Sequence, residues 1–223
     1  LREQNMTLLV ATHKLAGWGE SCSIIEALID LARIVEMANT DSIRAKTLII
    51  HALIFGDITY TPIQIEDDQS YSGEFSVRLN KKLYTDESEP YKARIKECEQ
   101  VITEQIESSG IDLNDPLSEL AKLYEQKDEY AGILMSQIYL ADNLAQYRKD
   151  AFEEHKNKGC KILLRLTSNK ENAMAQMLYG ICLLHGIEFT RFPSRGIQWI
   201  NSAGGNHHTS NIQILGKDLL AYE

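Results

Sequence analysis

Apolar residues recur at helical spacing along most of the chain. Between residues 21 and 38, for example, Ile24, Leu28, Leu31 and Val35 belong to one continuous apolar stripe. Apolar residues three and four positions apart lie on one face of an α-helix, so the pattern predicts an all-α fold. We expect helices, joined mostly by short turns, at 21–38, 43–55, 90–108, 116–126, 129–142, 149–167, 171–185, 194–203 and 210–222.

Glycine, proline and small polar residues mark several helix ends. Asp41 and Ser42 are predicted to cap the helix that follows them, because their side-chain oxygens can accept hydrogen bonds from free backbone N–H groups. Gly56 and Gly110 are placed to end helices in the left-handed conformation. Pro90 suits the first turn of the long charged helix.

The helical pattern breaks between residues 57 and 89. The segments Thr59–Ile65 and Glu74–Leu79 alternate weakly between apolar and polar residues, with the acidic run Glu66-Asp67-Asp68 between them. A short β-hairpin near 57–85 and a long ordered loop are equal alternatives for this insertion. Loops of this length are uncommon inside compact domains and often carry function.

A template of large and small residues recurs in the second half of the chain. Its clearest copy begins at Ala175 and ends at Gly186, with a small residue, Gly180, at its centre. The small residue is expected to let a partner helix approach closely, and Gly186 is expected to end the first helix in the left-handed conformation. Trp199 is expected to contribute the second helix's aromatic ring to the contact.

Two earlier copies are less complete. The copy at 131–142 has Met135-Ser136 at its centre and Asp142 in place of the final glycine, whereas the copy at 45–56 has Ile50 where a small residue is expected. A pair of helices cannot bury its apolar face alone, but stacked pairs can. The template therefore predicts a solenoid of helix–turn–helix repeats.

Three successive stretches together resemble the Sel-one-like repeats, a branch of the tetratricopeptide superfamily. They are Asn172–Gly180, then Arg195-Gly196-Ile197-Gln198-Trp199, and then Ala203-Gly204. The family pattern is roughly A-x3-L-G-x2-Y-x2-G followed by K-A-x2-W-x3-A-A. The resemblance is clearest at 171–216 and extends over about 115–223, while 21–56 matches more weakly. It implies a right-handed α-α superhelix.

These patterns divide the chain into three parts. We expect an N-terminal helical segment with a degenerate repeat at 1–56, an insertion loop with a long charged helix at 57–110, and a repeat solenoid at 111–223.

Composition and charge limit the partners. Apolar residues make up 43% of the 223 residues and charged residues 25%, which is typical of a globular protein with a sizeable core. The longest nearly uncharged apolar run, Thr47–Gly56, is half of a membrane span, so no transmembrane helix is expected.

The net charge is −9, with −12 over residues 1–142 and +4 over 143–196. The negative average surface disfavours nucleic-acid binding.

The cysteines and histidines indicate no metal site. Cys22, Cys98, Cys160 and Cys182 are far apart and form no CxxC pair, so no zinc site is expected. Free cysteines favour a reducing compartment, and we expect a cytoplasmic location, with a signal peptide either absent or already removed. The adjacent His207 and His208 are expected to lie in a turn between repeats.

No recognised catalytic or cofactor motif is present. The acidic run at 66–68 lacks the spacing of a calcium loop, and the glycines form neither a dinucleotide-binding nor a phosphate-binding motif. A nucleophile elbow and a zinc-protease motif are also absent. We therefore expect no catalytic residues, no cofactor and no enzymatic activity.

The resemblance implies that first helices line a concave face that binds a protein partner. Methionines among apolar neighbours make such a surface adaptable. The alternative is that an adjacent helix or the insertion buries these residues. The predicted partner-binding residues are Tyr130, Ile133, Gln137, Leu140, Met174, Met177, Ile181 and Leu184.

The function expected from this interpretation is that of a non-enzymatic adaptor or scaffold. A second hypothesis is an immunity or inhibitor protein that masks a toxin or effector, using the acidic N-terminal half and the 57–89 insertion. An enzyme with an unrecognised site is the third alternative.

Overall fold

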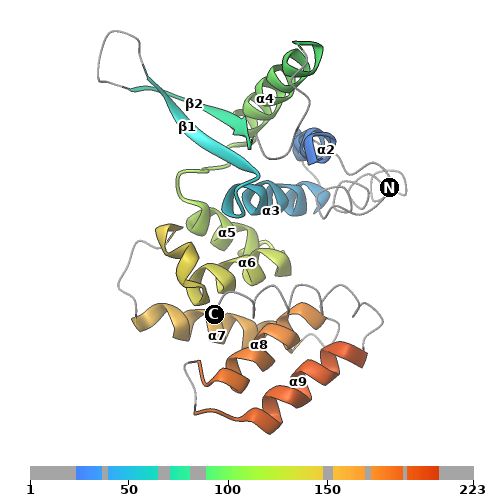
Figure 1. The fold of residues 1–223 in the computed structure, drawn as a ribbon, viewed down its shortest axis with the longest axis vertical. Helices are drawn as coiled ribbons and strands as arrows, with labels where there is room; N and C mark the ends of the chain where they lie inside the picture. Colours follow the sequence, from blue (N-terminus) through green and yellow to red (C-terminus); the bar gives the residue numbers. More distant parts are fainter. Residues whose placement is uncertain are drawn as a thin grey trace. The chain divides into compact units, whose positions relative to one another are not determined.

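The computed structural model describes residues 24–36, 40–64, 71–80, 89–147, 153–168, 172–187 and 190–205. The chain forms two compact units, residues 1–128 and 129–223 (Figure 1). The described residues are mostly helical with one small sheet, which confirms the predicted helical fold at this coarse level. The observed division differs from the predicted boundaries at 56 and 110, because α5 (Pro116–Glu125) packs against α3 (Thr40–Ile54) of the first unit.

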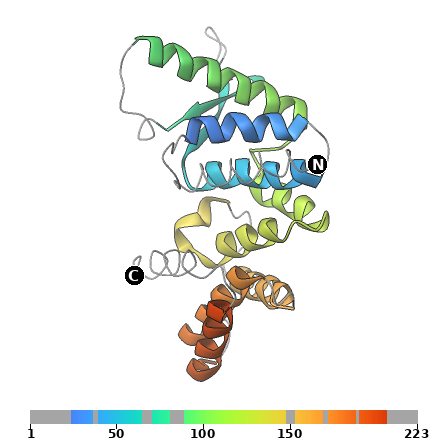
Figure 2. The same ribbon diagram turned by 90° about the vertical axis from the view of Figure 1, so that its right-hand side faces the viewer.

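Three helices make the core of the first unit. Helix α2 (Ile24–Glu36) packs against both α3 and α4 (Glu89–Ser109) and lies between them (Figure 2). The apolar stripes predicted from the sequence face this core. Its large side chains with less than 2% exposure include Leu28, Leu31, Ile34, Ile49, Ile50, Ile102 and Ile106.

The predicted ends of these helices are correct in part. Gly56 and Gly110 follow α3 and α4 with φ angles of 80° and 67°, which confirms their left-handed role. The prediction that Asp41 and Ser42 cap α3 is wrong, because the helix begins at Thr40 and includes both residues. A carboxylate in the first turn interacts favourably with the helix dipole, so Asp41 stabilises this end from inside the helix.

The insertion forms a β-hairpin. Strands β1 (Ile58–Gln64) and β2 (Tyr71–Leu79) are antiparallel, with Ile58 opposite Leu79 and Tyr60 opposite Val77. Buried Val77 and Leu79 flank the exposed Arg78 in the part of β2 whose side chains are described, so the weak alternation in the sequence did indicate strands. The acidic run at 66–68 lies outside the described residues.

A buried carboxylate connects the end of the first unit to α3. Asp128 is 5% exposed, and its carboxylate accepts hydrogen bonds from Arg44 Nε and Thr47 Oγ1 at 2.7 Å and 2.5 Å. Arg44 Nη2 lies 2.6 Å from the same carboxylate. Lys127, with a φ of 73°, reverses the chain just before Asp128. These contacts hold the segment after α5 against α3.

Four helices form the described part of the second unit, and consecutive helices pack against each other (Figure 1). They are α6 (Glu129–Leu140), α7 (Glu153–Leu166), α8 (Ala173–His185) and α9 (Pro193–Gly205). The 3-10 helix η2 (Asp142–Tyr147) follows α6 and contains Asp142, which was predicted to belong to α6. The predicted helix at 210–222, the pair His207-His208 and Cys22 lie outside the described residues.

Candidate functional site

The contact between α8 and α9 joins two glycines. A Cβ atom added at Gly180 of α8 would lie 2.8 Å from the Gly196 carbonyl oxygen of α9, and one at Gly196 would lie 2.7 Å from the Gly180 oxygen. Real Cβ atoms do not approach backbone oxygens so closely. Only glycine therefore allows α8 and α9 this separation, which confirms the predicted role of Gly180.

Helices α6 and α7 meet in the same way. A Cβ atom at Gly159 of α7 would lie 3.2 Å from the Ser136 carbonyl oxygen and 2.9 Å from Leu140 Cγ of α6. Ser136 corresponds to Gly180 after a shift of 44 residues, and Gly159 corresponds to Gly196 after a shift of 37. The two helix pairs therefore share one contact in one register.

Aromatic rings pack beside both glycine contacts. The ring of Trp199 meets that of Tyr179 edge-on, with centroids 5.8 Å apart, as the template predicted. In the preceding pair, His155 stacks on Tyr139 with centroids 5.4 Å apart. An edge-on or stacked ring pair adds to the stabilisation that burial alone provides.

Local capping fixes the ends of α8. The side chain of Asn172 accepts a hydrogen bond from the Ala175 N–H at 3.0 Å and also donates to Glu129 Oε2 at 2.8 Å. Gly186 ends the helix with a φ of 75°, as predicted. Because Glu129 begins α6, the Asn172 side chain joins the starts of the two first helices.

The predicted partner-binding residues show the same burial pattern in both first helices. Ile133 on α6 and Met177 on α8 are both 4% exposed, so neither has free surface for a direct contact. The other six residues are partly exposed. These are the equivalent pairs Tyr130 and Met174, Gln137 and Ile181, and Leu140 and Leu184.

Leu140 and Leu184 lie at the helix contact of their own pair. Leu140 Cγ is beside Gly159, and the Leu184 backbone is beside Gly196. Tyr130, Gln137, Met174 and Ile181 therefore remain the best candidates on the first helices. Their part in partner binding stays a prediction.

Two cysteines lie where α7 meets α8. Cys160 and Cys182 are 0% and 2% exposed, and the Cys160 thiol donates to the Ile187 carbonyl at a sulfur–oxygen distance of 3.7 Å. A hydrogen bond with Cys160, together with burial, raises the pKa of the Cys182 thiol. The thiol is therefore protonated and packs as a small apolar group.

Three exposed apolar side chains on or beside the second helices were missed by the sequence analysis. Leu164 on α7 is 45% exposed, while Phe192 and Ile197, just before and within α9, are 51% and 50% exposed. The family resemblance assigned partner binding to first helices, so exposed side chains on second helices were not predicted. The sequence carries no signal that separates the exposed Ile197 from its buried equivalent on α7, Cys160.

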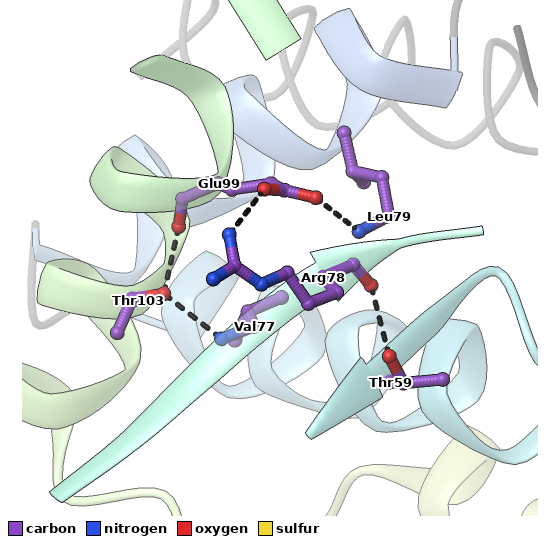
Figure 3. Close-up of polar contacts among 6 residues, drawn as sticks. All are labelled: Thr59, Val77, Arg78, Leu79, Glu99 and Thr103. Atoms are coloured by element: carbon purple, nitrogen blue, oxygen red, sulfur yellow. Dashed lines mark hydrogen bonds and ion pairs between the residues drawn. The ribbon is translucent and has the colours of Figure 1, made fainter. Parts of the chain in front are cut away.

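The hairpin in the first unit is a second candidate site. Glu99 of α4 accepts hydrogen bonds from the Leu79 N–H and from Arg78 Nη1, at 2.9 Å and 2.8 Å (Figure 3). Thr103 accepts from the Val77 N–H at 3.0 Å. These two side chains of α4 occupy the outer edge of β2, where a third strand would otherwise pair. They fix the hairpin to α4.

The other edge of the hairpin carries a proline. Pro62 on β1 pairs with Phe75 in the same alternation as Tyr60 with Val77, so its nitrogen faces away from β2. Proline has no N–H, and its presence on an edge strand opposes the addition of another strand. The backbone of β1 is thus a poor place for a strand-forming partner.

Beyond these contacts, two chemical properties of the described residues bear on function, namely metal-binding groups and shifted pKa values. Within these segments, no group of three or more histidine, cysteine and acidic side chains is placed to hold a metal ion. Burial lowers the pKa of His51 to about 4, and His51 packs edge-on against Phe55. Burial, followed by the nearby carboxylates of Glu107 and Asp112, raises the pKa of Tyr60.

No helix among the described segments has the length and apolar character that crossing a membrane requires. No family model matches the chain, and comparison with curated proteins and with solved structures found no match for it.

Proposed function

We propose that the chain is a non-enzymatic adaptor or scaffold that binds a protein partner through the first helices of a Sel-one-like repeat solenoid. One observation carries the proposal: two consecutive helix pairs use the same small-residue contact in the same register, at Ser136–Gly159 and Gly180–Gly196. Repeated pairs of this kind build extended surfaces for partner binding. The burial pattern, equal on α6 and α8, supports a surface that continues from one repeat to the next.

The partly exposed residues define where the partner binds. Gln137 and Ile181 are equivalent positions on α6 and α8, and neither lies beside the glycine contacts. Tyr130 and Met174 are the equivalent positions near the helix starts. Polar and adaptable apolar side chains on one surface suit a peptide or a helix of another protein.

Photo-crosslinking tests this proposal. A benzophenone side chain at position 137 or 181 should give the same covalent adduct with one protein of the native lysate. The matched controls are Lys161 and Gln198, equivalent and exposed positions on α7 and α9, which should give no such adduct. Substitution of Gln137 and Ile181 by lysine should abolish capture of that protein without changing the thermal midpoint. Equal adducts from all four positions would contradict the proposal.

The hairpin supports a second function, that of an inhibitor or immunity protein. Its anchoring by Glu99 and Thr103 holds two strands whose connection carries the acidic run at 66–68. Acidic residues between two anchored strands can attract a basic cleft. Under this hypothesis, lysine at positions 66–68 should slow association with the target, and the slowing should weaken in high salt. An adaptor acting through α6 and α8 would keep its binding.

A further inference from the structure

Two thiols meet at the contact between α7 and α8, which joins the first helix pair of the second unit to the second pair (Figure 1). Cys160 on α7 is 0% exposed and Cys182 on α8 is 2% exposed. Their side chains are hydrogen-bonded to each other, and both are free thiols in this structure. The two sulfur atoms are therefore neighbours that belong to separate helices.

The backbone of Ile187 contacts both cysteines. Its N–H donates to the Cys182 carbonyl oxygen at 2.9 Å, and its carbonyl oxygen accepts from the Cys160 thiol at a sulfur–oxygen distance of 3.7 Å. Ile187 follows Gly186, whose left-handed conformation turns the chain at the end of α8. The turn that ends α8 therefore holds this helix beside Cys160, independently of the contact between the two thiols.

The equivalent positions in the neighbouring helices carry isoleucine. Cys182 corresponds to Ile138 of α6 after the 44-residue shift, and Cys160 corresponds to Ile197 of α9 after the 37-residue shift. Ile138 is fully buried, so helix packing at this position does not require a thiol. In these two helix pairs, cysteine stands at both of the positions that meet between α7 and α8.

We propose that Cys160 and Cys182 form a reversible disulfide that fixes α8 to α7 under oxidising conditions. The bond closes a loop over residues 161–181 and joins the two helix pairs covalently. Such a bond restricts the unfolded chain and thereby stabilises the folded one. The inference does not depend on the proposed function, because neither cysteine belongs to the predicted partner-binding residues.

The oxidant is a small external disulfide such as oxidised glutathione. The thiolate of one cysteine attacks a sulfur of oxidised glutathione, which forms a mixed disulfide and releases one glutathione thiolate. The thiolate of the other cysteine then attacks the protein sulfur of the mixed disulfide and releases the second glutathione thiolate. The two protein thiols are oxidised, the glutathione disulfide is reduced, and the two thiol protons end on the two glutathione molecules.

Burial makes this exchange slow while α7 and α8 are in contact. Both side chains are enclosed, and the hydrogen bond with Cys160, together with burial, raises the pKa of the Cys182 thiol. Only the thiolate reacts with a disulfide, so exchange requires α8 to open from α7 and expose both sulfurs. The bond that forms when the helices close again then prevents the next opening.

Mass spectrometry of the full chain tests whether the bond forms. Cys22→Ala and Cys98→Ala leave one pair of cysteines, and this protein is incubated with oxidised glutathione at about pH 8 without denaturant. The intact chain should lose two hydrogens, and trypsin should release residues 159–161 joined to residues 171–191. The unsubstituted chain should give the same joined peptides, and dithiothreitol should separate them. Stable mixed disulfides with glutathione, disulfide-linked dimers or unreacted thiols would each overturn the proposal.

Thermal unfolding tests whether the bond fixes α8 to α7. The oxidised chain should melt about 5–10 °C above the same chain in dithiothreitol, and the amides of α8 should exchange more slowly. The matched control adds Cys160→Ala and Cys182→Ala, and its midpoint should be the same with oxidant and with reductant. An equal or lower midpoint for the oxidised chain would overturn the proposal. Crosslinking at positions 137 and 181 tests the first helices alone, so failure there and failure here are separate results.

Discussion

The first unit connects its elements through buried carboxylates, whereas the second unit packs the two helices of each pair together through glycines. Asp128 binds Arg44 and Thr47 across more than 80 residues of sequence, and Glu99 binds β2 from α4. In the second unit, Gly180 and Gly196 place two helix backbones in direct contact. The first arrangement joins unlike elements once, and the second can be repeated along a chain.

Different kinds of substitution disrupt the two kinds of contact. A small-residue contact leaves no room for any side chain, so it is broken by adding atoms. A buried carboxylate must keep its donors, so it is broken by removing atoms. The predictions below use this difference.

The largest effect is expected from Gly180→Leu. The first atom of the new side chain would lie 2.8 Å from a backbone oxygen that cannot move without moving α9. We expect a loss of about 3 kcal/mol in the free energy of unfolding. Urea denaturation gives the value, and hydrogen exchange should show faster opening in α8 and α9. Ser202→Ala, at an exposed position of α9, is the control and should change stability little.

Asp128→Ala should destabilise the first unit by about 2 kcal/mol, because Thr47 loses a buried acceptor and Arg44 loses its ion pair. The remaining Arg44 side chain is 43% exposed and can reach water, which limits the loss. Arg33→Ala removes an exposed ion pair with Asp30 and should cost under about 0.5 kcal/mol. Equal losses in denaturation would show that the Asp128 contacts contribute nothing special.

Removal of the hairpin anchor should act locally. Glu99→Ala leaves the Leu79 N–H without its acceptor, and we expect a loss of about 1–2 kcal/mol. The amides of Val77 and Leu79 should exchange faster, whereas those of α8 should not change. Gln100→Ala, an exposed neighbour on α4, should leave exchange in β2 as it is. Unchanged exchange at Leu79 in Glu99→Ala would show that the carboxylate does not hold the strand.

Acid should weaken the first unit through His51. Burial lowers the pKa of His51 from 6.5 to about 4 in the folded state. Between these two values, His51 is therefore protonated in the unfolded chain and neutral in the folded chain. Stability should therefore fall as the pH drops from 7 to 4, by about 1–2 kcal/mol since the ring keeps some contact with solvent. In His51→Gln this part of the pH dependence should disappear. Parallel curves for both proteins would contradict it.

The smallest effect distinguishes the two glycine contacts. A Cβ at Gly159 would first meet Leu140 Cγ, the flexible part of a side chain, whereas one at Gly196 meets backbone. Gly159→Ala should therefore cost about 1 kcal/mol, less than Gly196→Ala. The two unfolding midpoints, measured side by side, test the order. A larger loss for Gly159→Ala would mean that α6 and α7 are packed more rigidly than α8 and α9.

Several features could be predicted from the sequence because they depend on residues close together in the chain. Apolar spacing gave the helices, and Gly56, Gly110 and Gly186 ended three of them. The contact of Gly180 and the ring pair of Trp199 also followed from short-range spacing. The sequence favoured a β-hairpin and an ordered loop equally, because whether a short alternating segment forms a strand depends on what packs over it.

Only the tertiary structure decided which of these surfaces are covered. The family resemblance, which implied that Ile133 and Met177 lie on a binding face, could not show that packing buries them to 4% exposure. It equally could not distinguish the buried Cys160 from the exposed Ile197, which occupy the same position in successive pairs. Helix periodicity is set by local backbone geometry, whereas exposure depends on which distant segment packs alongside. The sequence therefore determined the elements and their close contacts, and the packing of elements decided which side chains remain free to bind.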